Sequence, residues 1–173
     1  TGVQTCALPI SLGARVFATA GSDEKLARVK ALGADELINY NTTNFADEIK
    51  QRTGGKGVDV LLESVGGETF ERNLLCMRPL GRIVVFGNSS GKVAMMKSTE
   101  FANRMISIAG FSFGALTNTR REIVAAAMQS VSELLARGAV RPIVGKTFPL
   151  AEARAAQDYI LSRQNYGKVL LEV

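Results

Sequence analysis

Two short apolar segments of this sequence run directly into small, hydroxyl-bearing loops. The segments are Val58–Glu63 and Arg82–Phe86, both rich in β-branched and long aliphatic residues. The loop residues concerned are Ser64, Val65 and Gly66 after the first segment, and Gly87 and Asn88 after the second. In an open parallel sheet the carboxyl ends of the strands form the rim of a ligand crevice, where backbone N–H groups and small side chains can approach a ligand. The pattern predicts a nucleotide cofactor at this rim.

A further strand end bears on which nucleotide is bound. Residues 16–20 (VFATA) predict a strand, followed by Gly21 and by Ser22, which would cap a helix beginning at Asp23. An NAD site normally places Asp or Glu at such a tip to hold the ribose 2′-OH, whereas a 2′-phosphate needs hydroxyl donors and a cation. Here the tip is small and Lys25 follows one turn into the helix, so we expect NADPH. Two alternatives stay open: Ser22 could be only a cap and Lys25 only a solvated residue, and a slight shift of the strand end would bring the Asp23 carboxylate near the ribose.

The composition is that of a soluble globular protein of about one domain. Of 173 residues, 46% are apolar and 21% are charged, and no segment approaches the roughly 20 apolar residues needed to span a bilayer. A cytoplasmic protein without membrane association is therefore expected. The net charge of +5 comes from dispersed basic residues, which favours a phosphorylated small molecule over nucleic acid as a partner. The sequence has no His and two Cys, Cys6 and Cys76, which excludes a His/Cys metal site and a Ser-His-Asp or Cys-His nucleophile within this chain.

The first ten residues (TGVQTCALPI) differ from the rest of the sequence. They show neither helical nor strand periodicity, and the chain continues from Leu12 as if in the middle of an element. The decamer resembles the translation of a sequencing-library adapter. We therefore expect residues 1–11 to be a non-native artefact, in which Cys6 has no role, and residues 12–173 to be a partial cofactor-binding domain.

From Leu12 onward, strand and helix signals alternate without a linker or repeat. The expected strands are residues 16–20, 36–39, 58–63, 82–86, 105–109, 147–150 and 168–172, and the expected helices are residues 23–32, 45–52, 68–75, 122–137 and 151–161. Repeated β-then-α segments imply right-handed crossovers and an α/β, Rossmann-like fold with a doubly wound parallel sheet. Nothing before Leu12 supplies the strand and glycine-rich turn that open a dinucleotide fold, so we expect the sheet to be truncated at its N-terminus.

Two features of the expected helices favour ordinary packing. Val124, Met128, Val131 and Leu135 share one face of the longest helix, and their spacings of four, three and four are typical of a core-facing stripe. Cys76, between two apolar neighbours, is expected to be a small buried hydrophobe.

Taken in order, seven short motifs resemble the medium-chain dehydrogenase/reductase superfamily. They are residues 19–25 (TAGSDEK), 32–35 (LGAD), 38–40 (INY), 54–59 (GGKGVD), 64–66 (SVG), 86–91 (FGNSSG) and 166–171 (YGKVLL). Within that superfamily the likeness is greatest to the zinc-independent NADPH:quinone oxidoreductases, the group that includes zeta-crystallin, and it extends from Leu12 to Val173. In that family the cofactor domain adjoins an N-terminal barrel-like catalytic domain, and the active cleft lies between them.

The resemblance assigns cofactor contacts position by position. Those implied at the 2′-phosphoadenosine end are Gly21, Ser22, Lys25 and Tyr40; those implied on the ribose and nicotinamide side are Ser64, Val65, Gly66, Phe86, Gly87, Asn88, Phe111 and Phe113; and those implied to close over the cofactor are Arg163, Asn165 and Lys168. Several have simpler alternatives: Tyr40 as an aromatic at a strand end, Phe86 as a core residue, and Arg163 and Lys168 as exposed bases. Glu63 stands where many relatives have Asp, which implies a weaker contact to the ribose.

The chemistry that the resemblance implies is hydride transfer from NADPH to a quinone or an α,β-unsaturated carbonyl. No residue of this chain is assigned as catalytic, because substrate and proton-relay groups would come from the absent domain. An enoyl reductase module, a zinc-type alcohol dehydrogenase and a non-enzymatic, crystallin-like nucleotide-binding protein remain alternatives. The parent protein is expected to be a homodimer that pairs the strand near residues 105–109 across two subunits. The 173 residues alone are expected to be inactive, with little cofactor affinity.

Overall fold

All the strand pairs in the part of the chain that the structure describes, residues 2–173, are parallel. The computed structural model contains three sheets with the orders β1-β2, β3-β4-β5 and β6-β7. The chain divides into two units: unit 1 comprises residues 2–41 and 128–173, and unit 2 comprises residues 42–127. The predicted α/β class, with its parallel strands, is confirmed, although the strands pair within three small sheets rather than one continuous sheet.

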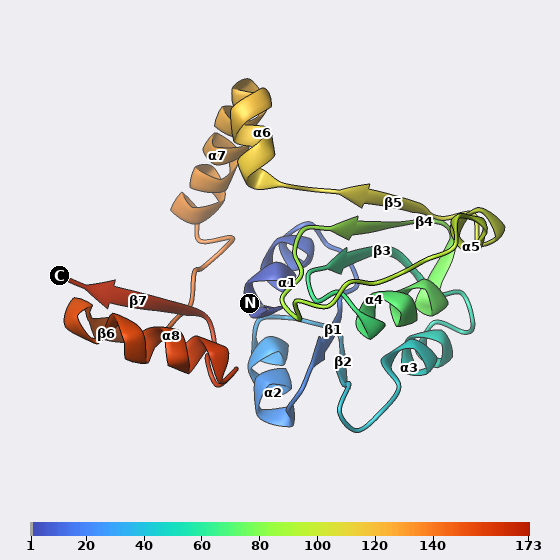
Figure 1. Ribbon diagram of the computed structural model, residues 1–173, viewed down its shortest axis with the longest axis horizontal. Coiled ribbons are helices and arrows are strands. Elements are labelled where there is room, and N and C mark those ends of the chain that lie inside the picture. Colours follow the sequence, from blue (N-terminus) through green and yellow to red (C-terminus); the bar gives the residue numbers. More distant parts are fainter. Residues whose placement is uncertain (1) are drawn as a thin grey trace. The chain divides into compact units, whose positions relative to one another are not determined.

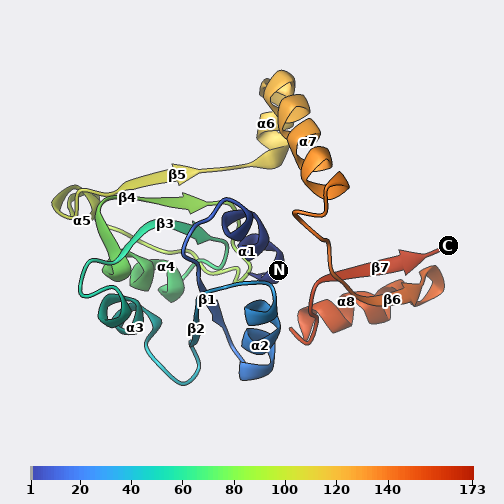
Figure 2. The ribbon, with the colours of Figure 1, turned by 180° about the vertical axis from the view of Figure 1, so that it is seen from behind.

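Unit 1 contains two of the parallel sheets and the helices next to them. Its elements are α1 (Gly2–Ser11), β1 (Phe17–Ala20), α2 (Asp23–Ala31), β2 (Glu36–Asn39), β6 (Val144–Pro149), the 3₁₀ turn η2 (Leu150–Glu152), α8 (Ala153–Leu161) and β7 (Lys168–Glu172). In both views of the ribbon, α2 lies beside β1 and β2 (Figures 1 and 2). Among residues 2–173 the first strand is therefore β1, and a helix precedes it.

Unit 2 is built on the three-stranded sheet, whose strands run side by side in Figure 1. Its elements are α3 (Phe45–Arg52), β3 (Val58–Glu63), α4 (Glu68–Asn73), the 3₁₀ turn η1 (Leu74–Cys76), β4 (Met77–Val85), α5 (Ser98–Asn103), β5 (Ser107–Gly110) and α6 (Phe113–Thr119). Helix α7 (Arg121–Ala136) continues from unit 2 into unit 1. The carboxyl ends of β3, β4 and β5 meet at one edge because the three strands are parallel.

The local sequence explains why α2 begins and ends where it does. The Ser22 hydroxyl accepts a hydrogen bond from the Lys25 backbone N–H at 3.4 Å, which satisfies one of the free donors of the first turn. Acidic residues occupy the first turn and basic residues the last, as the helix dipole favours. Leu26 and Val29 are buried on the face of α2 that meets the core, and the predicted cap is confirmed.

The N-terminal segment is helical, contrary to the sequence-based expectation of no regular structure. Cys6 and Ile10, which lie four residues apart on α1, pack against the buried cluster of Val16, Ala18, Val29 and Ala34. Tertiary packing of these two side chains therefore offsets the weak helical pattern and the proline within the helix. The artefactual origin of residues 1–11 stays a prediction.

The core of unit 2 lies beneath its sheet, where Leu74, Met77, Ile83 and Ile106 form a buried cluster. Strand β4 begins earlier than predicted, at Met77 rather than Arg82. Met77 pairs with Val58 of β3 and Arg82 pairs with Val60, so the residues between Met77 and Arg82 form an irregularity within the strand. Leu80, at φ +64°, lies in that irregular stretch.

The predictions about helices were incomplete in one respect and wrong in another. Helices α1, α5 and α6 had no clear periodic signal and were not predicted. The stripe on α7 was expected to face a core, but no residue of this helix is buried, and Met128 is 51% exposed. Apolar spacing therefore located the helix correctly and its environment wrongly. No helix within residues 2–173 is long and apolar enough to cross a membrane.

Candidate functional site

At the carboxyl ends of β1 and β2, unit 1 brings together the residues that were predicted to hold the 2′-phosphoadenosine end. Gly21 follows β1 and Tyr40 follows β2. A Cβ atom at Gly21 would lie 2.9 Å from the Tyr40 hydroxyl oxygen, so the absence of a side chain allows the phenol to approach the strand tip. Asn41 donates a hydrogen bond to the Gly21 carbonyl oxygen at 2.8 Å, which ties the two strand ends together.

Ser22 and Asp23 both have partners within the protein. Ser22 serves as the N-cap of α2, as the sequence predicted. One Asp23 carboxylate oxygen accepts a hydrogen bond from the Asn39 side-chain amide at 2.8 Å. The carboxylate that could have competed for a ribose hydroxyl is thus paired with the neighbouring strand end.

Lys25 connects this strand end to the C-terminal segment of unit 1. Its ammonium group donates a hydrogen bond to the backbone carbonyl oxygen of Arg163, which adopts a left-handed conformation at φ +58°. An ammonium has three donors, so this bond orients the charge without using all of them. Of the other predicted C-terminal residues, Asn165 is half-buried in the same connection and Lys168 begins β7 with an exposed side chain.

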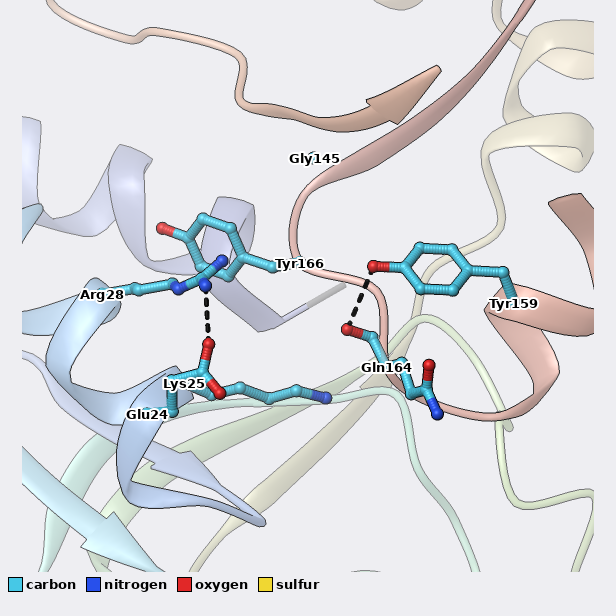
Figure 3. A pocket seen from close by; sticks show the side chains of 7 residues that line it. All are labelled: Glu24, Lys25, Arg28, Gly145, Tyr159, Gln164 and Tyr166. Carbon is cyan, nitrogen blue, oxygen red and sulfur yellow. Dashed lines mark hydrogen bonds and ion pairs between the residues drawn. The ribbon is translucent and has the colours of Figure 1, made fainter. Parts of the chain in front are cut away.

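A cavity of about 260 Å³ opens beside Lys25 (Figure 3). It is lined by Glu24, Lys25, Arg28, Gly145, Tyr159, Gln164 and Tyr166. The Arg28 guanidinium lies 4.6 Å above the centre of the Tyr166 ring and pairs with Glu24 at 2.6 Å, and the Tyr159 hydroxyl donates to the Gln164 carbonyl oxygen at 3.4 Å. Sequence reasoning missed Tyr159, and it missed Arg28 because the contact of Arg28 with Tyr166 joins α2 to a segment more than a hundred residues away.

Unit 2 brings together a second predicted group, at the ends of β3 and β4. Backbone hydrogen bonds join the two loops: Phe86 N–H to the Glu63 carbonyl at 2.9 Å, Ser89 N–H to the Ser64 carbonyl at 2.8 Å, and Ser90 N–H to the Val65 carbonyl at 2.9 Å. The loops therefore continue the pairing of the sheet beyond its regular strands. This continuation fixes Ser64, Val65, Gly87 and Asn88 along one edge.

Close approach requires glycine at one position of this edge and favours it at another. Gly66 has φ +80°, and a Cβ there would collide with the Asn88 side-chain oxygen. A Cβ at Gly87 would lie 3.3 Å from the Ser64 Cβ. The two glycines thus allow the loop after β3 and the loop after β4 to pack directly against each other.

The three predicted aromatic residues of unit 2 are partly exposed. Phe86 is 39% exposed, so its alternative as a core residue does not hold. Phe111 follows β5, where its N–H donates to the Val85 carbonyl at 2.8 Å, and Phe113 begins α6 after the capping residue Ser112. All three residues follow closely after strand ends, and none of them is buried.

Glu63, at the end of β3, belongs to a buried pair that the sequence does not predict. Glu63 is only 2% exposed, and its carboxylate accepts hydrogen bonds from the Val65 and Gly66 backbone N–H groups and from the side-chain amide of Asn73, which is also buried. Neither residue carries a sequence signal that reveals this pairing, because a strand-end acid and a helix-end amide are common.

Comparison with known proteins places these features in context. A family model described as zinc-binding dehydrogenase matches residues 2–133. The 2-haloacrylate reductase of a Burkholderia species is 34% identical over 165 residues, which cover 92% of this chain and 48% of the relative.

Two solved structures show the same fold. A quinone oxidoreductase from Escherichia coli, crystallised with NADPH, has a TM-score of 0.89 and 32% identity, and the match covers 99% of this chain and 53% of that one. An NAD-dependent alcohol dehydrogenase has a TM-score of 0.87 and 33% identity, with coverage of 99% and 47%. The chain spans about half the length of the curated relatives it matches.

Proposed function

Because this chain belongs to the zinc-binding dehydrogenase family, within the medium-chain dehydrogenase/reductase superfamily, we propose that it is the cofactor-binding portion of an NADPH-dependent reductase. The acceptor would be a small electron-poor molecule, a quinone or an α,β-unsaturated carbonyl. The names of its relatives, which include quinone oxidoreductases and a 2-haloacrylate reductase, support this class of substrate. These relatives also support a nicotinamide cofactor.

The preference for NADPH rests on one observation in unit 1. The tip of β1 presents Gly21 and Ser22, and Lys25 follows in the first turn of α2 with its ammonium bonded to the Arg163 carbonyl oxygen, while the carboxylate of Asp23 is hydrogen-bonded to Asn39. A 2′-phosphate carries negative charge and accepts hydrogen bonds, so it fits beside an ammonium and small residues. A free ribose 2′-OH would instead gain from an unpaired carboxylate at this position.

When bound, reduced nicotinamide supplies the hydride, and the residues of this chain supply position and environment. Ser64 and Asn88 offer polar side chains at one loop edge, and the exposed rings of Phe86 and Phe111 offer apolar surface that excludes water. No side chain of this chain is proposed to donate the proton that completes reduction of the acceptor. That proton comes from solvent or from groups outside these 173 residues.

Binding of 2′-AMP and 5′-AMP to the chain, followed by NMR chemical shifts at millimolar ligand, tests the nucleotide preference. The wild-type chain is expected to bind 2′-AMP more tightly, and Lys25→Met is expected to weaken that binding about tenfold, or about 1.4 kcal/mol, while 5′-AMP changes little. Lys30→Met, which removes an exposed ammonium from the last turn of the same helix, is the matched control. Equal affinity for the two nucleotides in wild type would reject the NADPH assignment.

A zinc-type alcohol dehydrogenase is the second candidate, favoured by the structural likeness to an NAD-dependent alcohol dehydrogenase, and an enoyl reductase is favoured in the same way by the likeness to a solved enoyl reductase. The gene sequence upstream of residue 1 separates the candidates. A barrel-like domain without zinc ligands would support the quinone or enone reductase, whereas Cys and His ligands in that region would support the alcohol dehydrogenase.

We further propose that these 173 residues alone do not catalyse hydride transfer. The expected result is no oxidation of NADPH at 340 nm with 1,4-benzoquinone beyond the uncatalysed rate. Turnover by this chain would contradict the proposal.

Self-association through β5, which lies at the edge of its sheet, also stays a prediction, and sedimentation of the purified protein would test it.

A further inference from the structure

A buried acid–amide pair lies directly behind the loop after β3. Glu63 is the last residue of β3 and Asn73 the last residue of α4, and their side chains are 2% and 4% exposed. A carboxylate so far from water is costly unless its oxygens receive hydrogen bonds. Two buried polar side chains in contact therefore call for a specific role.

Both oxygens of the Glu63 carboxylate are engaged. One oxygen accepts from the backbone N–H groups of Val65 and Gly66, the latter at 2.9 Å, and the other accepts from the Asn73 side-chain amide. Hydrogen bonds to an ionised acceptor are about twice as strong as neutral ones. The carboxylate thus closes the turn of its own loop, while Asn73 holds the carboxylate from the side of α4.

The backbone of this loop is consequently fixed on two sides. Its N–H groups at Val65 and Gly66 turn inward to Glu63, and its carbonyl groups at Ser64 and Val65 accept from the loop after β4. These main-chain groups are occupied within the protein. What the loop can offer to a ligand is its side chains and the position of Asn88, which packs against Gly66.

We propose that Glu63 and Asn73 are a positioning pair that holds the loop of Ser64, Val65 and Gly66 in its ligand-facing conformation. Glu63 then acts through the loop and makes no direct contact with a ribose, in contrast to the contact implied by the family resemblance. That the ligand is NADPH rests on the proposed function, whereas the conformational role of the pair does not.

Two single substitutions and their combination test the pair in the 173-residue chain. Glu63→Gln removes the charge at constant size, and Asn73→Asp places a second carboxylate against the first. The double variant Glu63→Gln with Asn73→Asp restores one carboxylate–amide contact in the reverse orientation, and the carbonyl oxygen of the introduced glutamine can still accept from the loop. Glu133→Gln is the matched control, because Glu133 also accepts from an amide, that of Gln129 at 3.3 Å, but on an exposed helix.

The first measurement is amide hydrogen exchange of Val65 and Gly66 by NMR. Exchange is expected to become at least about tenfold faster in both single variants, to return to within about threefold of wild type in the double variant, and to stay unchanged in the control. If Asn73→Asp does not fold, Glu63→Gln and the double variant still give the comparison. Unchanged exchange in Glu63→Gln, or no recovery in the double variant, would overturn the proposal that this pair holds the loop.

The second measurement is the Kd for NADPH, followed by NMR chemical shifts at millimolar ligand because the 173 residues alone are expected to bind weakly. This Kd is expected to rise about tenfold in Glu63→Gln and to recover in the double variant. A loss of exchange protection without a change in Kd would overturn the ligand-facing part of the proposal. If the wild-type chain binds no NADPH, the proposed function fails for this chain, while the exchange data still decide whether the pair holds the loop.

Discussion

The two strand-end groups of this protein are held by different kinds of interaction. In unit 1, the group at β1 and β2 is held by side chains: Lys25 to the Arg163 carbonyl, Asn39 to Asp23, and Asn41 to the Gly21 carbonyl. In unit 2, the loops after β3 and β4 are held by backbone hydrogen bonds and by a buried carboxylate. The first group is held by side chains at the surface, whereas the second, whose loops are partly exposed, is anchored through the buried Glu63 carboxylate.

This difference predicts how each group responds to substitution. Exposed side-chain contacts each contribute little to stability, because water competes for the same donors and acceptors. Breaking the contacts to the buried Glu63 carboxylate would instead leave a polar group with no water to replace them. Unit 1 should therefore tolerate changes that alter which ligand is bound, whereas comparable changes in unit 2 should first destabilise the fold.

The largest expected effect is that of Gly66→Ala in unit 2. The introduced alanine would have to keep φ +80°, a conformation that residues with a Cβ rarely adopt. Its Cβ would collide with the Asn88 side chain and would lie 3.0 Å from the Lys92 carbonyl oxygen. We expect a loss of about 3 kcal/mol in the free energy of unfolding, measured in urea. Gly91→Ala is the control, since Gly91 has φ +69° but open space around it, and it should lose about 1 kcal/mol. Equal losses would show that backbone strain alone, and not the packing of the two loops, sets the cost.

A smaller effect is expected from the thiol of Cys76, which lies beneath the same sheet. The residue is fully buried, as predicted, and burial raises the pKa of its thiol to about 11, against smaller lowering contributions from a backbone hydrogen bond and from Lys50. A raised pKa in the folded state means that folding favours the protonated thiol. Its contribution to stability is therefore complete below about pH 9 and is lost as the pH rises towards 11.

The measurement is the free energy of unfolding at several pH values from about 8 to about 11, in wild type and in Cys76→Ala. Between these limits the wild type should lose about 2 kcal/mol more than the variant, since each pKa unit corresponds to about 1.4 kcal/mol. Taking the difference removes the contribution of Lys and Tyr residues that titrate in the same range. Parallel curves would mean that water reaches this thiol, and the contrast between the interior of unit 2 and the surface of unit 1 would be weaker.

What could be predicted from the sequence is the part determined by near neighbours. The Ser22 cap could be predicted because its hydroxyl bonds the backbone N–H of a residue only three positions away. Gly66 could be singled out because it lies in a short loop directly after a strand. The positions of most strands and of the longer helices followed in the same way from periodicity, whereas α1, α5 and α6 did not. The family resemblance then grouped residues that periodicity alone could not bring together.

What could not be predicted depends on contacts between distant segments. The bond between Lys25 and the Arg163 carbonyl joins residues 138 positions apart, and the Glu63–Asn73 pair depends on how α4 returns to the end of β3. The stripe on α7 shows the converse limit: its spacing is that of a core helix, yet Val131 and Leu135 are about 40% exposed. Spacing reports the face of an element and does not report what covers it.

The smallest expected effect sharpens the comparison from the side of unit 1. Arg28 lies over the Tyr166 ring at 4.6 Å and joins α2 to the C-terminal segment beside the Lys25 cavity. A double-mutant cycle with Arg28→Met and Tyr166→Leu should give a coupling of about 0.5 kcal/mol, because the guanidinium is partly exposed and also pairs with Glu24. Thermal unfolding of the four proteins measures it. A coupling above about 2 kcal/mol would mean that this contact is as strongly anchored as the loops of unit 2, and the proposed division between an adaptable nucleotide end and a fixed loop edge would then fail.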